Sequence, residues 1–333
     1  MMTAIQVGQT VKSTKTGLIG TVESINKERT KATVRTTDYS GNEVLSSTTV
    51  TVPLAELKPV TVKTTTPKDV LEEYEEELEQ TALEVVLAHV NAINALSDGN
   101  NVEDSMAQLI SKLKDAYTKE SQVDTPTTDL DSLVAKVDAL TDTNYFINGT
   151  FVEIGVKPKQ DVKNNLPTER YPNEHRLFHQ VAEFHKVGGH PVAQEPTEIE
   201  LQRLIDRTGY TSEEIVEFLH SMSRSQEEFK QRFDKFFSLV QLHMQNLEDT
   251  DTTVVDELNK AHKATLKLFD LINMPSTVFG DIVHNANMTK FYINDEGEYY
   301  AKTRESDGKI LKSPDFVAPE PLIRAKVEEL LSK

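Results

Sequence analysis

The stretch VDALTDTNYFINGTFVEIG, Val137 to Gly155, places acidic side chains in an otherwise apolar helical pattern. Asp138 and Asp142 are four residues apart, so on a helix they share one face. Their neighbours in this stretch are apolar or aromatic: Val137, Leu140, Tyr145, Phe146 and Ile147. Like charges this close repel each other, and acids within an apolar helix need a partner. A cation is the natural one.

A second acidic cluster lies in TSEEIVEFLHS, residues 211–221, where Glu213 and Glu214 both neighbour Glu217 on a helix. Each cluster resembles half of a site for a hard divalent cation, which prefers carboxylate oxygens. A helical bundle brings such clusters together in its core. The alternative stays open, because in a chain with 54 acidic residues an E-E-x-x-E string is also typical of a solvated helix face.

Composition narrows the class of protein. The chain has 333 residues, enough for two or three domains, and no apolar stretch long enough to cross a bilayer. Its start lacks an apolar signal-peptide core, so we expect a soluble, cytoplasmic protein with no membrane partner. The absence of cysteine excludes disulfides, thiolate zinc sites and a cysteine nucleophile. A net charge of −18 argues against broad nucleic-acid binding.

The N-terminal part differs from the rest in charge and pattern. Residues 1–66 contain eight basic and five acidic side chains, a net charge of +3, which leaves −21 for the remainder. Within 4–60, apolar and polar residues alternate between Gly- and Asn-containing turns, which predicts a small β-barrel over residues 1–60. The pattern resembles SH3-like or KOW-like barrels, which bind proteins or nucleic acids. A passive docking or spacer module is the alternative, and residues 61–68 form a Thr-rich linker.

From Pro67 onward the pattern predicts helices. Their expected ranges are 69–95, 102–119, 129–155, 174–188, 198–222, 225–247, 252–273 and 277–290. The helix over 198–222 is expected to continue through Gly209, because the apolar face persists on both sides.

The helical part also resembles itself. An ungapped match at an offset of 118 aligns residues 137–140 with 255–258 and 151–158 with 269–276, and a weaker match aligns 83–87 with 216–220. We interpret this as a diverged tandem duplication, with a degenerate first repeat over 69–166 and a second over 174–333 that includes a C-terminal tail. Chance similarity of two helices is the alternative. In this register Asp142 lies opposite Lys260, and Gln80 and Thr81 lie opposite Glu213 and Glu214.

Four segments carry a family resemblance: 133–156, 178–192, 213–221, and 283–316 with its VHNANMTK and DGKILKSPDF motifs. They resemble MazG-like all-α nucleotide pyrophosphohydrolases, in particular the branch similar to phosphoribosyl-ATP pyrophosphohydrolase. The resemblance implies a mainly α protein, a helical bundle of the all-α NTP pyrophosphohydrolase type, here as a tandem pseudo-dimer with the small β-barrel attached. It implies an enzyme that uses Mg²⁺, or Mn²⁺ in its place, to split a nucleoside triphosphate into monophosphate and pyrophosphate. Because such proteins are commonly tight dimers, it also implies a homo-oligomer.

The resemblance assigns roles to individual residues. Glu213, Glu214, Glu217, Asp138 and Asp142 match the metal ligands, and Glu214 or Glu217 would serve as catalytic base. The positions that approach the nucleotide and its phosphates are Asn287, Lys290, Lys309 and Lys312. The alternatives are solvent exposure for the lysines and a cap for Asn287. His185, His190, His220 and His284 are candidate base or phosphate contacts, or packed and surface histidines.

The order of the motifs departs from the family. Family members carry the glutamate cluster before the aspartate helix within one repeat, whereas here the intact aspartate helix comes first. One composite site per chain would restore the chemistry. The alternative is a catalytically decayed scaffold or partner-binding protein.

Overall fold

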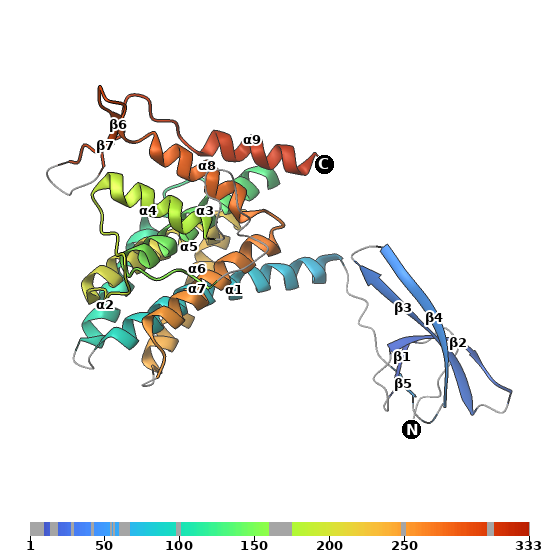
Figure 1. The fold of residues 1–333 in the computed structure, drawn as a ribbon. Coiled ribbons are helices and arrows are strands. Elements are labelled where there is room, and N and C mark those ends of the chain that lie inside the picture. The colour runs from blue at the N-terminus through green and yellow to red at the C-terminus, as the bar shows by residue number, and fades with distance from the viewer. Residues whose placement is uncertain are drawn as a thin grey trace. The chain divides into compact units, whose positions relative to one another are not determined.

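The computed structural model describes residues 10–13, 19–27, 30–40, 43–53, 55, 57–59, 67–97, 101–159, 175–247, 251–304 and 310–332. The chain divides into two compact units, residues 1–74 and 75–333. Helices dominate, and a small antiparallel sheet occupies the N-terminal part (Figure 1). The expected mainly helical fold with a small N-terminal β region is therefore confirmed.

The N-terminal sheet has five strands in the order β4-β3-β2-β1-β5, and each described pair is antiparallel. The strands are β1 (Thr10–Ser13), β2 (Ile19–Ile25), β3 (Lys31–Ser40), β4 (Glu43–Pro53) and β5 (Leu57–Pro59). Val22, Ala32, Val34 and Val52 form its core because alternate residues of a strand face the same side. β4 and β5 are the edges of the described pairing, so a closed barrel stays a prediction.

The helical unit contains all eight predicted helices, with ends within three residues of those expected. The helices are α1 (Pro67–Leu96), α2 (Val102–Glu120), α3 (Asp129–Glu153), α4 (Arg176–Gly188), α5 (Leu201–Ser221), α6 (Gln226–Gln245), α7 (Val254–Leu271), α8 (Ser276–Met288) and α9 (Glu320–Leu331). Two elements were not predicted, namely α9 and a short hairpin of β6 (Tyr292–Ile293) and β7 (Tyr299–Tyr300). Within the described ranges, none of the helices combines the length and apolarity needed to span a membrane.

Three helices begin at side-chain caps that the sequence supplies. Thr128, Ser225 and Thr253 each precede a helix, and each side-chain oxygen accepts a hydrogen bond from the amide three residues later. Such caps satisfy one of the free amides at a helix start. These contacts place the first turns of α3, α6 and α7.

α3 lies at the centre of the helical unit, where it packs against α4, α5, α7, α8 and α9 (Figure 1). α3 and α5 run antiparallel, since Ser132 Oγ donates to the carbonyl of Ser221 at 2.7 Å while Glu153, at the other end of α3, binds Arg203 near the start of α5. This pairing brings the middle of α3 beside the middle of α5.

α5 is continuous through Gly209, as predicted. A Cβ on Gly209 would lie 2.5 Å from Cδ of Lys112 on α2. The glycine therefore permits the close approach of α2 to α5 rather than ending the helix.

The C-terminal ends of α3 and α7 have the same local structure. Gly155 and Asn273 both adopt left-handed backbone conformations, with φ of 66° and 54°. The amide of Val156 donates to the carbonyl of Phe151 at 3.1 Å, and that of Met274 donates to the carbonyl of Phe269 at 2.9 Å. Both correspondences follow the offset of 118 found in the sequence.

Candidate functional site

The two acidic clusters face each other where α3 packs against α5. Asp142 of α3 raises the pKa of Glu214 and Glu217 on α5, and Glu217 raises that of Asp138 on α3. All four side chains are only partly buried, so solvent reaches them. We call Asp138, Asp142, Glu214 and Glu217 the carboxylate seam.

The seam brings carboxyl groups together whose charges repel one another, and the charges of Lys290 and Lys119 oppose the resulting rise in pKa only in part. Burial is the largest cause of the shifts, and the neighbouring carboxylates add to it. The pKa is raised to about 8 at Asp138, about 6 at Asp142 and about 7 at Glu217, and well above the ordinary value at Glu214. Within the described parts of the chain, none of the four forms a hydrogen bond or an ion pair. Such a site takes up either protons or a cation.

Glu213 has a different environment from the seam. Its carboxylate pairs with Lys119 at the end of α2. Glu120, the next residue, raises the pKa of Glu217, and its Oε1 lies 2.8 Å from His220 Nδ1. Glu213 therefore already has a cation, and α2 contributes charges that the sequence motifs did not include.

The oxygen atoms of the seam carboxylates are suitable ligands for a hard divalent cation, but their present positions do not form a metal site. Carboxylate oxygens are the ligands that Mg²⁺ prefers. As the side chains lie, no three acidic or histidine residues in the described ranges form a group able to hold a metal ion. Binding would therefore require the carboxylates to rotate toward one another, which their partial exposure permits.

The predicted nucleotide-binding residues gather beside the seam at the end of α8. Lys290 opposes the rise in the pKa of Asp142, and its Nζ donates to Asn287 Oδ1 at 2.6 Å. The ring centroid of Phe316 lies 5.9 Å from Lys290 Nζ and 4.1 Å from Lys312 Nζ. Lys290 and Lys312 thus lie around one aromatic ring, and Asn287 is hydrogen-bonded to Lys290. Lys309 lies outside the described residues.

A further carboxylate near the seam comes from the unpredicted α9. Glu320, in its first turn, raises the pKa of both Asp138 and Asp142. α9 is attached to α3 through Arg324, whose Nη2 lies 2.5 Å from Asp131 Oδ1, and through the fully buried Ile323. No sequence spacing relates Glu320 to the aspartates, because only the folded chain brings α9 to α3.

The four candidate histidines all have charged or aromatic neighbours other than the four seam carboxylates. His220 pairs with Glu120, His284 Nε2 lies 3.3 Å from Glu183, and His185 Nε2 lies 3.2 Å from Arg207 Nη2. Burial, with the charge of Arg207, lowers the pKa of His185 to about 4 and also lowers that of His190. We therefore assign these histidines to packing networks.

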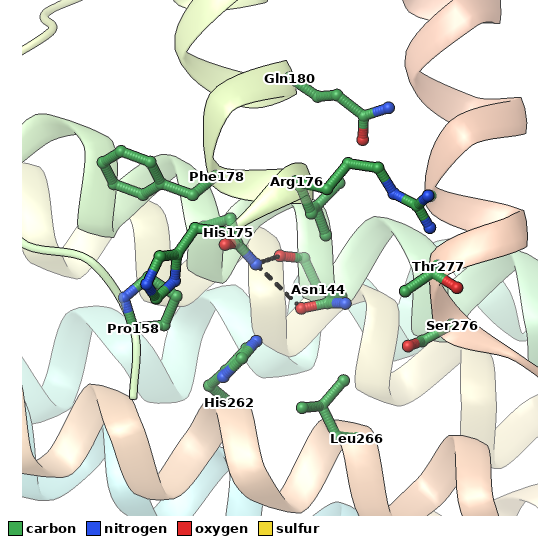
Figure 2. Close-up of a pocket in the computed structure, with 13 residues that line it drawn as sticks. Asn144, Pro158, His175, Arg176, Phe178, Gln180, His262, Leu266, Ser276 and Thr277 are labelled. Carbon is green, nitrogen blue, oxygen red and sulfur yellow. Dashed lines mark hydrogen bonds between the residues drawn. The ribbon is translucent and has the colours of Figure 1, made fainter. Parts of the chain in front are cut away.

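A small polar pocket lies between α3, α4, α7 and α8 (Figure 2). Asn148 on its wall donates from its side-chain amide to the carbonyl oxygen and to Oδ1 of Asn144, at 2.9 and 3.0 Å. Its volume of about 10 Å³ is room for about one water molecule. It is too small for a nucleotide.

Comparison with known proteins gives one similar structure. No protein-family profile matches the chain, and no curated protein matches it. A solved structure from Exiguobacterium sp. 255-15, described as a "putative NTP pyrophosphohydrolase", shares 29% identity over 47% of this chain and 96% of its own. Its TM-score is 0.43.

Proposed function

We propose that this chain is a Mg²⁺-dependent nucleoside triphosphate pyrophosphohydrolase with one composite site, formed between α3 and α5. The observation that carries the proposal is the carboxylate seam. Four partly accessible carboxylates come together from helices far apart in sequence, their pKa values are raised by burial and by nearby carboxylates, and none of them forms an ion pair in the described chain. An arrangement that costs free energy without a cation is typical of a metal site.

The seam residues would hold the metal, with Asp138 and Asp142 on one side and Glu214 and Glu217 on the other. Bound Mg²⁺ would neutralise the triphosphate and make a water molecule acidic enough to attack phosphorus. A carboxylate not used as a ligand accepts the water's proton. Glu214 and Glu217 are the candidates for that role, because both carboxylates face the aspartates from α5.

The lysines beside the seam would act on the phosphates. Lys290 lies close enough to Asp142 to lower its pKa, and Lys312 shares the Phe316 ring with it. Their positive charge would offset the negative charge that develops as the bond to the pyrophosphate breaks.

The composite nature of the site is supported by what α7 lacks. At the offset of 118, Lys260 corresponds to Asp142, and its Nζ lies 2.6 Å from Glu257 Oε1. Asp256, which corresponds to Asp138, pairs with Lys159 at 3.3 Å and lies partly exposed. Of the two positions of α7 that match Asp138 and Asp142, one is therefore an aspartate that already has a cation and the other is a lysine, which favours one site per chain.

The test is pyrophosphate release from a panel of (d)NTPs with Mg²⁺. We expect release from at least one substrate, and its loss in Asp142→Asn and in Glu214→Gln. Asp256→Asn is the matched control and should keep more than half of the wild-type rate. No release from any substrate, together with no Mg²⁺-dependent change in melting temperature, would refute the enzyme.

The second candidate is a decayed scaffold that binds a partner. It is favoured by the finding that, in the described residues, no three acidic or histidine side chains lie in positions that could hold a metal ion. Stabilisation by Mg²⁺ without any turnover would support it.

A further inference from the structure

A second, larger pocket lies between α1, α6 and α7. Its cavity volume is about 590 Å³, within the roughly 300–1,000 Å³ usual for small-molecule sites. Leu87 and Ala88 of α1 and Ala264 of α7 give it an apolar lining. The pocket is large enough for a nucleoside and its phosphates.

One wall of this pocket is fixed by a chain of hydrogen bonds. Glu257 is 1% exposed and accepts hydrogen bonds from Lys260 Nζ at 2.6 Å and from Asn91 Nδ2 at 3.3 Å. Asn91 Oδ1 in turn lies 2.7 Å from His243 Nε2. A buried carboxylate is costly without a partner, and here Lys260 supplies the compensating charge.

Two further lysines of α7 line the pocket. Lys263 and Lys267 are four residues apart, so they share a helix face at a spacing of about 6 Å along the axis. Lys267 lies 3.1 Å from Glu77, but both side chains are about half exposed, and such pairs contribute little and exchange readily. Lys263 forms no ion pair with any residue the structure describes. The exposed Glu84 and Asp270 also line the pocket, where their carboxylates can accept hydrogen bonds from the amino and hydroxyl groups of a ligand.

In the sequence match, pocket residues of α1 and α7 correspond to seam residues of α5 and α3. In the sequence match Lys260 corresponds to Asp142, and Glu84 corresponds to Glu217. Lys260 Nζ is already paired with Glu257, so the positive charge available to a ligand comes from Lys263 and Lys267. A phosphate-bearing ligand held by these two ammonium groups would need no metal ion here.

We propose that the α1–α7 pocket is a second, non-catalytic site that binds a nucleoside polyphosphate without divalent metal. The base would lie on the apolar lining, and the phosphates would contact Lys263 and Lys267. The choice of a nucleotide as ligand class rests on the proposed function, but the site does not use the seam.

The test is equilibrium binding of ATP, GTP, CTP and UTP to the full chain in EDTA. At least one should bind to wild type, and Lys263→Glu and Lys267→Glu should each weaken binding at least tenfold. Lys230→Glu is the matched charge control, because Lys230 is an exposed residue of α6 that pairs with Asp234 outside the pocket. Lys230→Glu and the seam variant Asp142→Asn should stay within twofold of wild type.

Two further ligands test the apolar lining and the two lysines of the pocket separately. The nucleoside alone and inorganic triphosphate should each bind at least tenfold more weakly than the best nucleotide, because each uses only the lining or only the lysines. Melting temperatures of the lysine variants within a few degrees of wild type would show that they fold.

Several outcomes would overturn the second site. They are no nucleotide binding in EDTA, binding that survives both lysine variants, equal loss in Lys230→Glu, or loss in Asp142→Asn. Metal-free binding with no pyrophosphate release would keep this site and refute the proposed function, whereas turnover with no binding in EDTA would do the reverse.

Discussion

Asp138 holds a proton at neutral pH in the folded chain, because burial and the charges of Asp142 and Glu217 raise its pKa to about 8. A carboxyl group whose pKa is raised on folding stabilises the fold below its unfolded pKa, and this contribution is lost as the pH rises toward about 8. Asp138→Asn removes the charge and keeps the shape. In EDTA we expect the variant to be more stable than wild type at pH 8 by about 1–3 kcal/mol, allowing for solvent access, and close to it at pH 5.

Urea unfolding at the two pH values in EDTA measures this difference. Asp256→Asn is the control with the opposite sign, because Thr253 and Lys159 lower the pKa of Asp256 and its charge stabilises the fold. A variant at Asp138 that destabilises equally at both pH values would show that its carboxylate is not under repulsion.

The buried His89 should make the folded chain less stable as the pH falls. It is 1% exposed, its Nδ1 lies 2.8 Å from the carbonyl of Val85, and its Nε2 has no hydrogen-bond partner in the described chain. Burial lowers its pKa to about 4, so the stability of the neutral form is complete above about 6.5 and is lost as the pH falls through about 4. We expect His89→Leu to reduce the loss of melting temperature between pH 7 and pH 4, as measured by thermal unfolding. An unchanged pH dependence would contradict the assignment.

At the scale of elements, variants of α9 can show whether apolar packing or an ion pair contributes more to holding this helix against α3. Ile323 is fully buried, while Arg324 and Asp131 are 41% and 33% exposed. Ile323→Ala should cost about 2–4 kcal/mol, whereas Arg324→Ala should cost less than about 1 kcal/mol. Chemical denaturation measures both. A larger cost for Arg324→Ala would mean that the ion pair controls the attachment.

The sequence predicted elements better than contacts between them. The eight helices from α1 to α8 have a clear apolar period, and caps such as Thr128 set their starts. α9 is not predicted from the sequence, because its residues follow the DGKILKSPDF motif and are assigned to the C-terminal tail of the second repeat. Lys119 and Glu320 could not be related to Asp138 from sequence, since their proximity arises from packing of α2 and α9. Likewise, the order of the acidic motifs along the chain does not predict that α3 and α5 pack antiparallel.

At the scale of the molecule, the described residues of the seam and its surroundings lie between Lys119 and Glu320, within the second compact unit. The N-terminal part carries a net charge of +3 and the remainder −21. We therefore expect that a chain beginning at Pro67, the first residue of α1, keeps the pyrophosphate release and the Mg²⁺-dependent melting temperature of the full chain within twofold and within a few degrees.

The same pair of chains tests a docking role for the N-terminal sheet. If the sheet binds nucleic acid through its basic residues, the full chain should bind duplex DNA at 50 mM salt, lose at least tenfold in affinity at 200 mM, and lose binding entirely without residues 1–66. Affinity that does not change with salt, or that remains in the shorter chain, would exclude an electrostatic role for the sheet. A shorter chain that folds but no longer hydrolyses nucleotides would instead show that the N-terminal unit takes part in catalysis.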